Sequence, residues 1–459
     1  MKDRIIDPAA LNFPDGPWGT CVNGQTYQQE AIVSFRGWQY AAYFGAGGAL
    51  CVARRALPEG KWEVVRFTDY TFASATPNDT HNVVTIGIAA DDGSIHLFFD
   101  HHCEPLHYRR SIPQLAARPA EMAWTVASFG PVVNELEAGK PIPELTYPMQ
   151  FTAPSGKLQL CYRVGGSGDG DWYLVEYDGS TGKWSTLGML FSRAGAYQSS
   201  PSRCAYPNSF RYGGDGRLHV TWCWRERPQD APFDLRTNHD INYACSDDAG
   251  RSWKNNAGAP LAQINVPGKP QPIGIDSPGI LVRPTRFLWG QMNTNTQFVD
   301  ARGRVHLISW QQDQEADQGS KDLNPWRYYH YWRANTNAWN TNLLPFQGRK
   351  PQIVLDRAGT AFVLFAKSDN RNYHGSDPGG TLTIMAASEA SGWRDWKPVW
   401  SLEQPLFVGE PQYDHGRWQR DGILTIYAQE KPERPGAPSA LHAIDVTLPA
   451  AASPPPRAE

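Results

Sequence analysis

Histidine, tyrosine and arginine side chains, which can move protons and bind anions, recur at the ends of short alternating segments of this chain. His81 lies in NDTHN, His101 in FDHHC, Tyr147 in LTYPM and Arg163 in LCYRV. Histidine titrates near neutral pH, and tyrosine can donate a proton, or accept one where nearby cations lower its pKa. Arginine stays charged, and its planar guanidinium matches a carboxylate. If the fold brings these side chains together, they predict acid–base chemistry on an anionic substrate.

A repeat in the sequence indicates which elements hold these residues. A glycine turn leading into an alternating strand occurs seven times, at Gly37, Gly93, Gly156, Gly216, Gly303, Gly359 and Gly422. Short strands of period two, with almost no helical periodicity, are typical of β-sheet units of about four strands. The repeat therefore predicts an all-β fold, a seven-bladed β-propeller with four-stranded antiparallel blades.

The fourth repeat carries a further turn signature, and a long insertion follows it. Ser246, Asp248, Gly250 and Trp253 match the S-x-D-x-G-x-x-W Asp-box of propeller hairpins, in which the aspartate caps the turn and the tryptophan packs between blades. The insertion, about residues 256–290, is rich in Pro and Gly and has the length of a functional rim. We expect residues 1–449 to form a single domain and residues 450–459 to be disordered.

The predicted propeller places the chemistry at one mouth of its central channel. The innermost strand of each blade begins at this mouth, and the next strand returns to it after the glycine turn. Counting back and forward from the turn glycines gives the polar residues expected there: Gln28, His81, Tyr147, Tyr206, Asn293, Lys350 and Glu410 at the beginnings, and His101, Arg163, Arg225, Gln311 and Lys367 at the returning ends. We predict that these groups surround an anionic substrate; the alternative is a mouth whose polar residues bind only water.

The histidines fall into different classes. Three of them follow a turn glycine by three residues, and this recurrence predicts a structural role for His96, His219 and His306. His81 and His101 break the repeat pattern and are expected at the mouth, where a catalytic role is predicted. His102 should point to the opposite side of the strand from His101, so it is not included in the predicted site.

Several segments of the sequence resemble a known family. THNVVTIGIAADDGSIHLFFDHH, LTYPMQFTAPSGKLQLCYRVGGSGDGDWYL, CAYPNSFRYGGDGRLHVTWCWRE and PWRYYHYWR are similar to segments of the BNR-repeat seven-bladed-propeller polysaccharide lyases. This group contains ulvan lyases and L-rhamnosyl-α-1,4-D-glucuronate lyases. The resemblance extends from about Tyr27 to Gly359.

The resemblance implies β-elimination at a 4-linked glucuronate, with rhamnose leaving from O4 and a 4,5-unsaturated uronate as the product. The glycan would be ulvan or a rhamnose-capped arabinogalactan-type chain. The family's functional residues fall on His81, His101, Tyr147, Arg163, Tyr206 and Arg327 of this sequence. The last of these, an arginine late in the chain, is expected in a loop at the same mouth.

The chemistry of elimination suits these groups. The C5 proton of a glucuronate becomes removable only when its carboxylate charge is offset, which we assign to Arg163 and Arg327. A base then takes the proton and an acid protonates O4, which we expect His101 and Tyr147 to share while His81 orients the substrate or assists. Gln28, Tyr206, Arg225, Asn293, Arg327 and Lys350 are the expected substrate-binding residues.

Composition limits the partners of the chain. Its formal net charge of −3 argues against nucleic acid, and no run of apolar residues is long enough for a membrane helix. We expect a monomer that binds an acidic glycan and needs no cofactor, although the resemblance allows a structural Ca or Zn ion. The first residues do not form a signal peptide, which predicts a cytoplasmic protein, or a periplasmic or secreted one if the start is trimmed.

Two other functions remain open at this point. Related propellers hydrolyse the same rhamnose–glucuronate bond as α-L-rhamnosidases, and a fold alone does not distinguish them from lyases. A propeller with an aromatic-rich mouth can also bind carbohydrate without turning it over.

Overall fold

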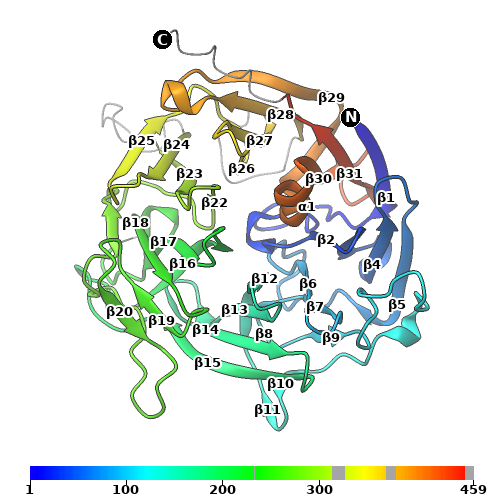
Figure 1. The fold of residues 1–459 in the computed structure, drawn as a ribbon, viewed down its shortest axis with the longest axis horizontal. Coiled ribbons are helices and arrows are strands. Elements are labelled where there is room, and N and C mark those ends of the chain that lie inside the picture. Colours follow the sequence, from blue (N-terminus) through cyan, green and yellow to red (C-terminus); the bar gives the residue numbers. More distant parts are fainter. Residues whose placement is uncertain (232, 313–325, 369–378, 450–459) are drawn as a thin grey trace, which may run out of the picture.

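The computed structural model describes residues 1–231, 233–312, 326–368 and 379–449. Figure 1 shows β-sheets arranged in a ring around a central axis. The expected disordered tail, residues 450–459, lies outside the described residues. Within them, no helix combines the length and the apolar character that a membrane crossing requires.

The first half of the ring contains three sheets and a hairpin. The first sheet has strands β2 (Ile32–Phe35), β3 (Trp38–Phe44), β4 (Ala49–Ala56) and β5 (Glu63–Thr71). The second has β6 (Val84–Ile88), β7 (Ile95–Phe99) and β9 (Tyr108–Arg110). The third has, in spatial order, β8 (His102–Glu104), β12 (Leu145–Thr152), β13 (Leu158–Gly166), β14 (Asp169–Asp178) and β15 (Lys183–Phe191). The hairpin consists of β10 (Glu135–Glu137) and β11 (Lys140–Pro141).

Three further sheets complete the ring. One has β16 (Arg203–Tyr212), β17 (Leu218–Glu226), β18 (Asn238–Ser246), β19 (Ser252–Lys254) and β20 (Pro260–Gln263), with β21 (Leu281–Arg283) paired to β18. The next has β22 (Thr296–Val299), β23 (Val305–Gln312), β24 (Trp326–Arg333) and β25 (Trp339–Leu343). The last is a seven-stranded sheet of β26 (Gln352–Leu355), β27 (Ala361–Lys367), β28 (Gly380–Ala387), β29 (Lys397–Tyr413), β30 (Ile423–Glu430), β31 (Ser439–Thr447) and β1 (Lys2–Ala10).

Short helical segments occupy some of the connections. The only α-helix of the described residues is α1 (His415–Asp421), which begins at Asp414, whose side chain accepts a hydrogen bond from the Arg417 amide. The 3-10 turns are η1 (Thr26–Gln28), η2 (Ala46–Gly48), η3 (Val126–Ser128), η4 (Leu235–Thr237) and η5 (Glu389–Ser391). The expectation of an all-β fold is therefore confirmed.

Six of the turn glycines lie in hairpin turns, as the repeat predicted, and Gly422 ends α1, the helix that connects β29 to β30. Each lies between two strands that pair antiparallel, and each has a positive φ between 65° and 89°: Gly37, Gly93, Gly156, Gly216, Gly303, Gly359 and Gly422. Glycine adopts this left-handed conformation without the steric cost that a Cβ brings. The Asp-box is confirmed too, because Asp248 accepts hydrogen bonds from the amide and hydroxyl of Ser252 and Trp253 is buried.

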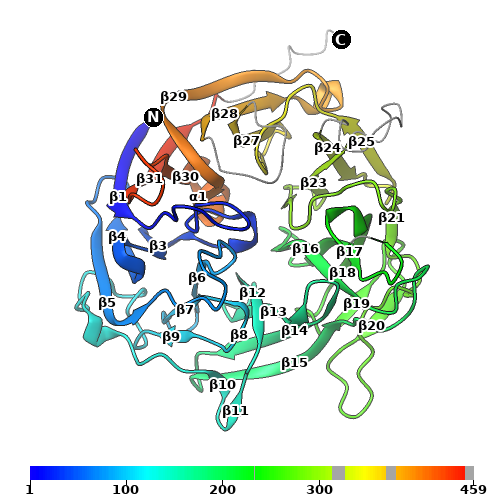
Figure 2. The ribbon, with the colours of Figure 1, turned by 180° about the vertical axis from the view of Figure 1, so that it is seen from behind.

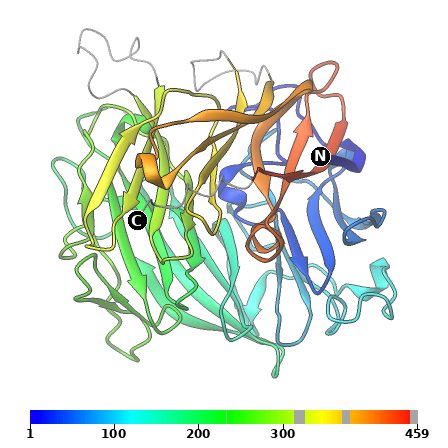
Figure 3. The ribbon, with the colours of Figure 1, turned by 45° about the horizontal axis from the view of Figure 1, so that its top comes forward.

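The two ends of the described chain meet in one sheet. β1 pairs antiparallel with β31, with Asp3 opposite Ile444 and Ile5 opposite His442, and Figure 2 shows the two strands side by side. The 17-residue strand β29 pairs with β28 through its first part and with β30 through its last part. In Figure 3 its orange ribbon runs along the rim from the yellow strands to the red ones. The first strand of the chain thus closes the ring against the last.

Residues 24–31 cross the central channel. The Gln29 amide donates hydrogen bonds to the carbonyls of Gln150 on β12 and Phe210 on β16, both at 3.1 Å. The Thr26 hydroxyl donates to the carbonyl of Thr294, next to β22, at 2.8 Å. These partners belong to sheets that do not neighbour β2 in the ring. The segment therefore separates the two ends of the channel.

The predicted insertion packs along the ring. It forms β20 and β21, and the Ile273 backbone exchanges hydrogen bonds with Leu190 and Ser192 at the end of β15. The insertion thus covers the outer strand of the preceding sheet. A functional role for it stays a prediction.

Candidate active site

Three adjacent strands bring together residues that are far apart in sequence. In the sheet that begins with β8, His102 pairs with Thr146 of β12, and Thr146 pairs with Arg163 of β13. Tyr147 follows Thr146 directly. The register therefore places an imidazole, a phenol and a guanidinium at the same end of the sheet.

A β-bulge sets the direction of Tyr147. The register between β12 and β13 shifts by one residue between Thr146 and Met149, and Tyr147 has φ 54°. A positive φ is strained for a bulky residue and is found mainly where function requires it. Tyr147 lies with its ring centroid 5.1 Å from Tyr27 and 5.9 Å from His81. The bulge thus aims the phenol at the His81 side of the mouth.

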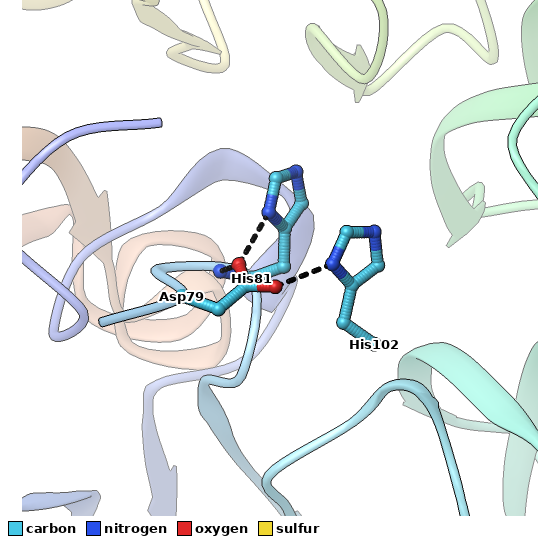
Figure 4. Close-up of side chains that lie close together, drawn as sticks. All are labelled: Asp79, His81 and His102. Atoms are coloured by element: carbon cyan, nitrogen blue, oxygen red, sulfur yellow. Dashed lines mark hydrogen bonds and ion pairs between the residues drawn. The ribbon is translucent and has the colours of Figure 1, made fainter. Parts of the chain in front are cut away.

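Asp79 holds two histidines. The Nδ1 of His81 and the Nδ1 of His102 lie 2.8 and 2.5 Å from the two oxygens of its carboxylate (Figure 4). A carboxylate only accepts hydrogen bonds, so both Nδ1–H groups donate and both Nε2 atoms are left as acceptors. The rings stack with centroids 4.2 Å apart. One carboxylate therefore fixes the tautomer and the orientation of both imidazoles.

The charges of this group follow from its contacts. Burial alone would raise the pKa of Asp79, but the hydrogen bonds from the two imidazoles outweigh it and hold this pKa well below its usual range. Burial, followed by the neighbouring His102, lowers the pKa of His81 to about 4. His81 is therefore neutral at neutral pH, as a proton acceptor must be. Each of these three residues offers one atom that can bind a metal ion, and these atoms lie within 4.8 Å of one another. The three side chains could therefore also hold a metal ion.

Aromatic rings enclose the imidazoles. Tyr27 stacks on His81 at 5.1 Å with an interplanar angle of 9°, and its hydroxyl donates to the Thr80 carbonyl. Trp18 meets the edges of His81 and His102 at 4.7 and 5.2 Å. Trp18 is 41% exposed, whereas Tyr27 is buried. The mouth thus presents an exposed indole beside the two imidazoles, a surface on which a sugar ring can stack.

Arg163 differs from the other fully buried arginines. Arg55, Arg109, Arg203 and Arg417 each form an ion pair with a carboxylate. In the described part of the chain Arg163 has no such pair, although it is 0% exposed. Its guanidinium lies 5.0 Å from the Tyr147 ring, and its Nε donates to the Gly165 carbonyl at 3.0 Å. A buried cation without an anion is costly, so this site favours an anionic ligand.

Tyr206 holds Arg163 together with a second arginine. Its hydroxyl lies 3.3 Å from an Nη of Arg163, 3.4 Å from an Nη of Arg225 and 2.9 Å from the Ser167 hydroxyl. It is 1% exposed. Tyr206, predicted to bind substrate, therefore positions two guanidinium groups.

Lys350 lies across the mouth. Its ammonium is 3.2 Å from the Thr26 hydroxyl and 3.8 Å from a Glu410 oxygen, and 5.7 Å from the centre of the Tyr27 ring. Burial is the largest cause that lowers its pKa. A pocket lined by Trp18, Tyr27, His81, Lys350 and Glu410 opens here. Lys350 is thus in the position that the propeller argument predicted for it.

The predicted placement of His101 is wrong. His101 is 1% exposed, its Nε2 accepts a hydrogen bond from the His107 amide at 2.8 Å, and its ring stacks on His107. The strand count failed because β7 ends at Phe99 and Asp100 has φ 65°, after which His102 starts a new strand in the next sheet. His102, which the prediction set aside, occupies the mouth instead.

Among the other predicted binding residues, Gln28 is enclosed by backbone, and the roles of Asn293 and Arg327 stay predictions. Gln28 is fully buried, donating to the Val84 carbonyl at 2.6 Å and accepting from the Gly24 amide at 3.1 Å, so its predicted contact with substrate is contradicted. Its amide is engaged by backbone because it belongs to the segment that crosses the channel. Asn293 precedes Thr294 beside that segment. Arg327 lies near the start of β24, opposite Gln311, and its role stays a prediction.

Asp79 was not among the predicted site residues. Its signal was present in NDTHN, since an aspartate two residues before a histidine can reach the imidazole of the same turn. The link to His102 had no local signal, because it depends on how β8 joins the sheet of β12.

The fold and this site define the class of the protein: an all-β, propeller-like ring with an acid–base group and an unpaired buried arginine at one mouth. The family model described as "BNR repeat-containing family member" matches residues 38–346. The chain belongs to this family, which confirms the resemblance seen in the sequence.

Curated relatives carry the name "Ulvan lyase, long isoform". The chain is 23% identical over 405 residues to the protein of Pseudoalteromonas sp. (strain PLSV), covering 81% of this chain and 37% of that protein. It is 22% identical over 412 residues to the protein of Glaciecola sp. (strain KUL10), covering 82% of this chain and 38% of that protein. The chain thus spans well under half the length of these relatives.

Solved structures share the fold. The crystal structure of polysaccharide lyase Uly1 aligns with a TM-score of 0.74 at 18% identity, over 97% of this chain and 99% of that chain. A PL25 ulvan lyase bound to -[GlcA(1-4)Rha3S]- aligns with a TM-score of 0.69 at 15% identity, over 96% of this chain and 95% of that chain. At these identities the likeness shows the fold alone.

Proposed function

We propose that this protein is a polysaccharide or oligosaccharide lyase that cleaves a rhamnose–glucuronate linkage by β-elimination. The observation that carries the proposal is Arg163, a buried cation without a carboxylate partner in the described residues, beside the strained Tyr147. The names of the curated relatives support a lyase, and the ligand of the PL25 structure contains the glucuronate–rhamnose pair.

Charge neutralisation is the role of Arg163 in this proposal. A uronate that enters the mouth places its carboxylate beside Arg163, with Arg225 and Lys350 adding positive charge. Once the Arg163 guanidinium binds the substrate carboxylate, it offsets the negative charge of that group. It thereby stabilises the enolate-like intermediate that forms when C5 loses its proton. Tyr206 keeps both arginines in place through its hydroxyl.

Proton transfer is the role of the imidazoles and Tyr147. An Nε2 of the His81–His102 pair accepts the C5 proton, and Asp79 stabilises the imidazolium that results. The electrons left at C5 form the C4–C5 double bond as the C4–O4 bond breaks. Tyr147 protonates the bridging oxygen O4, which leaves with rhamnose as its anomeric hydroxyl. The products are a 4,5-unsaturated uronate and a free hydroxyl on the departing sugar.

Some finer features belong to the same proposal. We infer seven blades, with the seven-stranded sheet counted as two that share β29, and a single domain over residues 1–449. We propose a monomer, since one chain supplies every group named above. The elimination as written uses no cofactor, because arginine offsets the carboxylate charge. The family resemblance leaves room for a structural Ca or Zn ion.

Ultraviolet absorbance of the unsaturated product tests this function. The purified chain is incubated with ulvan, and we expect absorbance to rise for the unchanged protein. Tyr147→Phe and His102→Ala should each lower the initial rate by about 100-fold or more. The matched control His101→Gln, which can keep the hydrogen bond to the His107 amide, should retain most of the rate.

Other outcomes would contradict the proposal in distinct ways. New reducing ends without absorbance would identify a hydrolase, and retention of glycan without any cleavage would identify a binding protein. Loss of the rate in His101→Gln, with full activity in His102→Ala, would overturn the assignment of the imidazoles.

A further inference from the structure

The other end of the central channel holds a second pocket. Its walls are the last residues of the inner strands β2, β6, β12 and β16, next to the turn glycines, together with α1. Glu30, Gln150, Phe210, Arg211 and His415 line it, and its cavity volume is about 290 Å³. The segment of residues 24–31 separates this pocket from His81 and Tyr147. The volume is near the lower limit for small-molecule sites and suits a single sugar ring.

Two buried polar atoms in the pocket lining have no hydrogen-bond partner within the described residues. They are the Nε of Arg211, a residue 8% exposed, and the Oε1 of Gln150, a residue 0% exposed. Leaving such atoms unpaired is costly, and native interiors avoid it. One atom donates and the other accepts. Neither atom is open to solvent, so a hydroxyl group, which can both donate and accept, pairs with them only when the Arg211 and Gln150 side chains turn toward the pocket.

The electrostatics of the pocket disfavour an anion. Arg211 forms an ion pair with Glu30, whereas Arg163 at the other end has no carboxylate partner among the residues that the structure describes. Burial and the Arg211 charge hold the pKa of His415 well below its usual range, so this ring is neutral. The far pocket therefore lacks the free positive charge that characterises the mouth with Tyr147.

A second cavity adjoins the pocket, and two largely buried aromatic side chains belong to its lining. This cavity of about 650 Å³ shares Thr152, Tyr212 and Gln419 with the pocket and is lined by Phe298 and Trp418. Asp300, Asp356 and Asp421 line this cavity along with Arg357 and Arg420, which leaves no excess of positive charge. Aromatic faces beside hydrogen-bonding groups are the usual lining of a carbohydrate site.

We propose that this far pocket binds a neutral saccharide unit through its hydroxyl groups. The site is separate from the mouth that handles the acidic sugar, so the chain holds glycan at two ends of one channel. The inference does not depend on β-elimination, because it concerns binding at residues that the proposed reaction does not use.

Saturation-transfer NMR with L-rhamnose as the neutral probe tests the inference. We expect a signal from L-rhamnose with the full chain, and an excess of D-glucuronate, which the mouth attracts, should leave this signal unchanged. Gln419→Trp and Gly416→Leu each add bulk at the pocket lining from α1 and should weaken L-rhamnose binding by about tenfold or more. Lys397→Trp, which adds the same indole on exposed β29, should bind as the unchanged chain does.

The controls separate this inference from the proposed reaction. Neutral-sugar binding should survive in Tyr147→Phe, and elimination should survive in Gln419→Trp. Absence of L-rhamnose binding to the unchanged chain would overturn the inference. The inference would also be overturned if Gln419→Trp and Gly416→Leu bound L-rhamnose as well as the unchanged chain does. Loss of binding in Tyr147→Phe would overturn it too, because it would place the sugar at the mouth. Circular dichroism of each variant establishes that it is folded.

Discussion

Asp79 is the residue that organises the acid–base group, since one carboxylate orients both imidazoles. We expect Asp79→Asn to lower kcat by about tenfold or more, with little change in KM, because an amide no longer fixes both tautomers. Its hydrogen bond also raises the pKa of His81, so its removal should shift the acidic limb of the kcat/KM profile to lower pH. An unchanged profile would contradict a positioning role. Asp178→Asn, at the end of β14, is the matched control.

Arg163 is a buried charge without a carboxylate partner among the described residues, so we expect it to contribute to activity and not to stability. We expect Arg163→Met to lower activity by about 100-fold or more, while the free energy of unfolding stays within about 1 kcal/mol of the original. Arg203→Met, which removes the guanidinium from the buried Glu226 and leaves it only the His239 imidazole at 3.3 Å, should cost about 3–5 kcal/mol. Denaturant unfolding measures both. Equal destabilisation by the two changes would show that Arg163 has a partner in the fold.

The sequence predicted the chemistry of individual residues better than their directions. His81, Tyr147, Arg163 and Lys350 lie where the distance from the turn glycines placed them. The prediction exchanged His101 for His102 because a strand count assumes that alternation continues, whereas Asp100 adopts a left-handed conformation and interrupts it. Aspartate tolerates that conformation, but its presence alone does not announce a change of sheet.

The strand pair β1–β31 carries a titratable contact. His442 of β31 lies 2.9 Å from the Asp3 carboxylate of β1 and 3.5 Å from that of Glu430. Burial opposes protonation, but the two carboxylates outweigh it and raise the pKa of His442. A histidine whose pKa is higher in the folded protein than in the unfolded one stabilises the fold at pH values below its unfolded pKa of about 6.5. This stabilisation is lost as the pH rises through the pKa of the folded protein.

Thermal unfolding against pH tests this contact. The unchanged chain should exceed His442→Gln in Tm below about pH 6, and the difference should shrink at alkaline pH. We expect a contribution below about 1 kcal/mol, because Asp3 and Glu430 are about one-third exposed. A difference that grows with pH would contradict the assignment. Asp3→Asn should reproduce the effect of His442→Gln.

At the scale of elements, hairpins were predictable and irregular strands were not. A turn glycine has a local cause, its positive φ, and six of the seven lie in hairpin turns, while Gly422 ends α1 between β29 and β30. The bulge at Tyr147 and the short strand β8 depend on pairing with distant strands. No periodic pattern in the sequence indicates such pairing. The direction of the side chains that the bulge and β8 bring to the mouth could therefore be seen only in the structure.

The distribution of charge over the whole molecule predicts how salt affects the reaction. The chain has a formal net charge of −3, yet Arg163, Arg225 and Lys350 gather at one mouth. Association with an acidic glycan should therefore weaken as salt screens the charges. We expect KM to rise with ionic strength while kcat changes little. A KM that is independent of salt would argue against a cationic mouth that attracts an acidic polymer.

The ring itself followed from the repeat, but its interior did not. Seven turn glycines indicate hairpins arranged in series, and closure of β1 on β31 completes them. Residues 24–31 carry no pattern that distinguishes a segment crossing a channel from an ordinary loop. The sequence therefore did not predict two separate pockets. They follow from the hydrogen bonds of Gln29 to β12 and β16 in the structure.

The source of oxygen in the product tests the central claim most directly. The chain is incubated with a rhamnose–glucuronate oligosaccharide in water enriched in heavy oxygen, and the products are analysed by mass spectrometry. Elimination predicts a uronate product lighter than the hydrolytic one by one water, with no heavy oxygen in either fragment beyond the exchange that reducing ends show without the protein. A saturated uronate, with heavy oxygen in one fragment at the cleaved bond, would contradict the account.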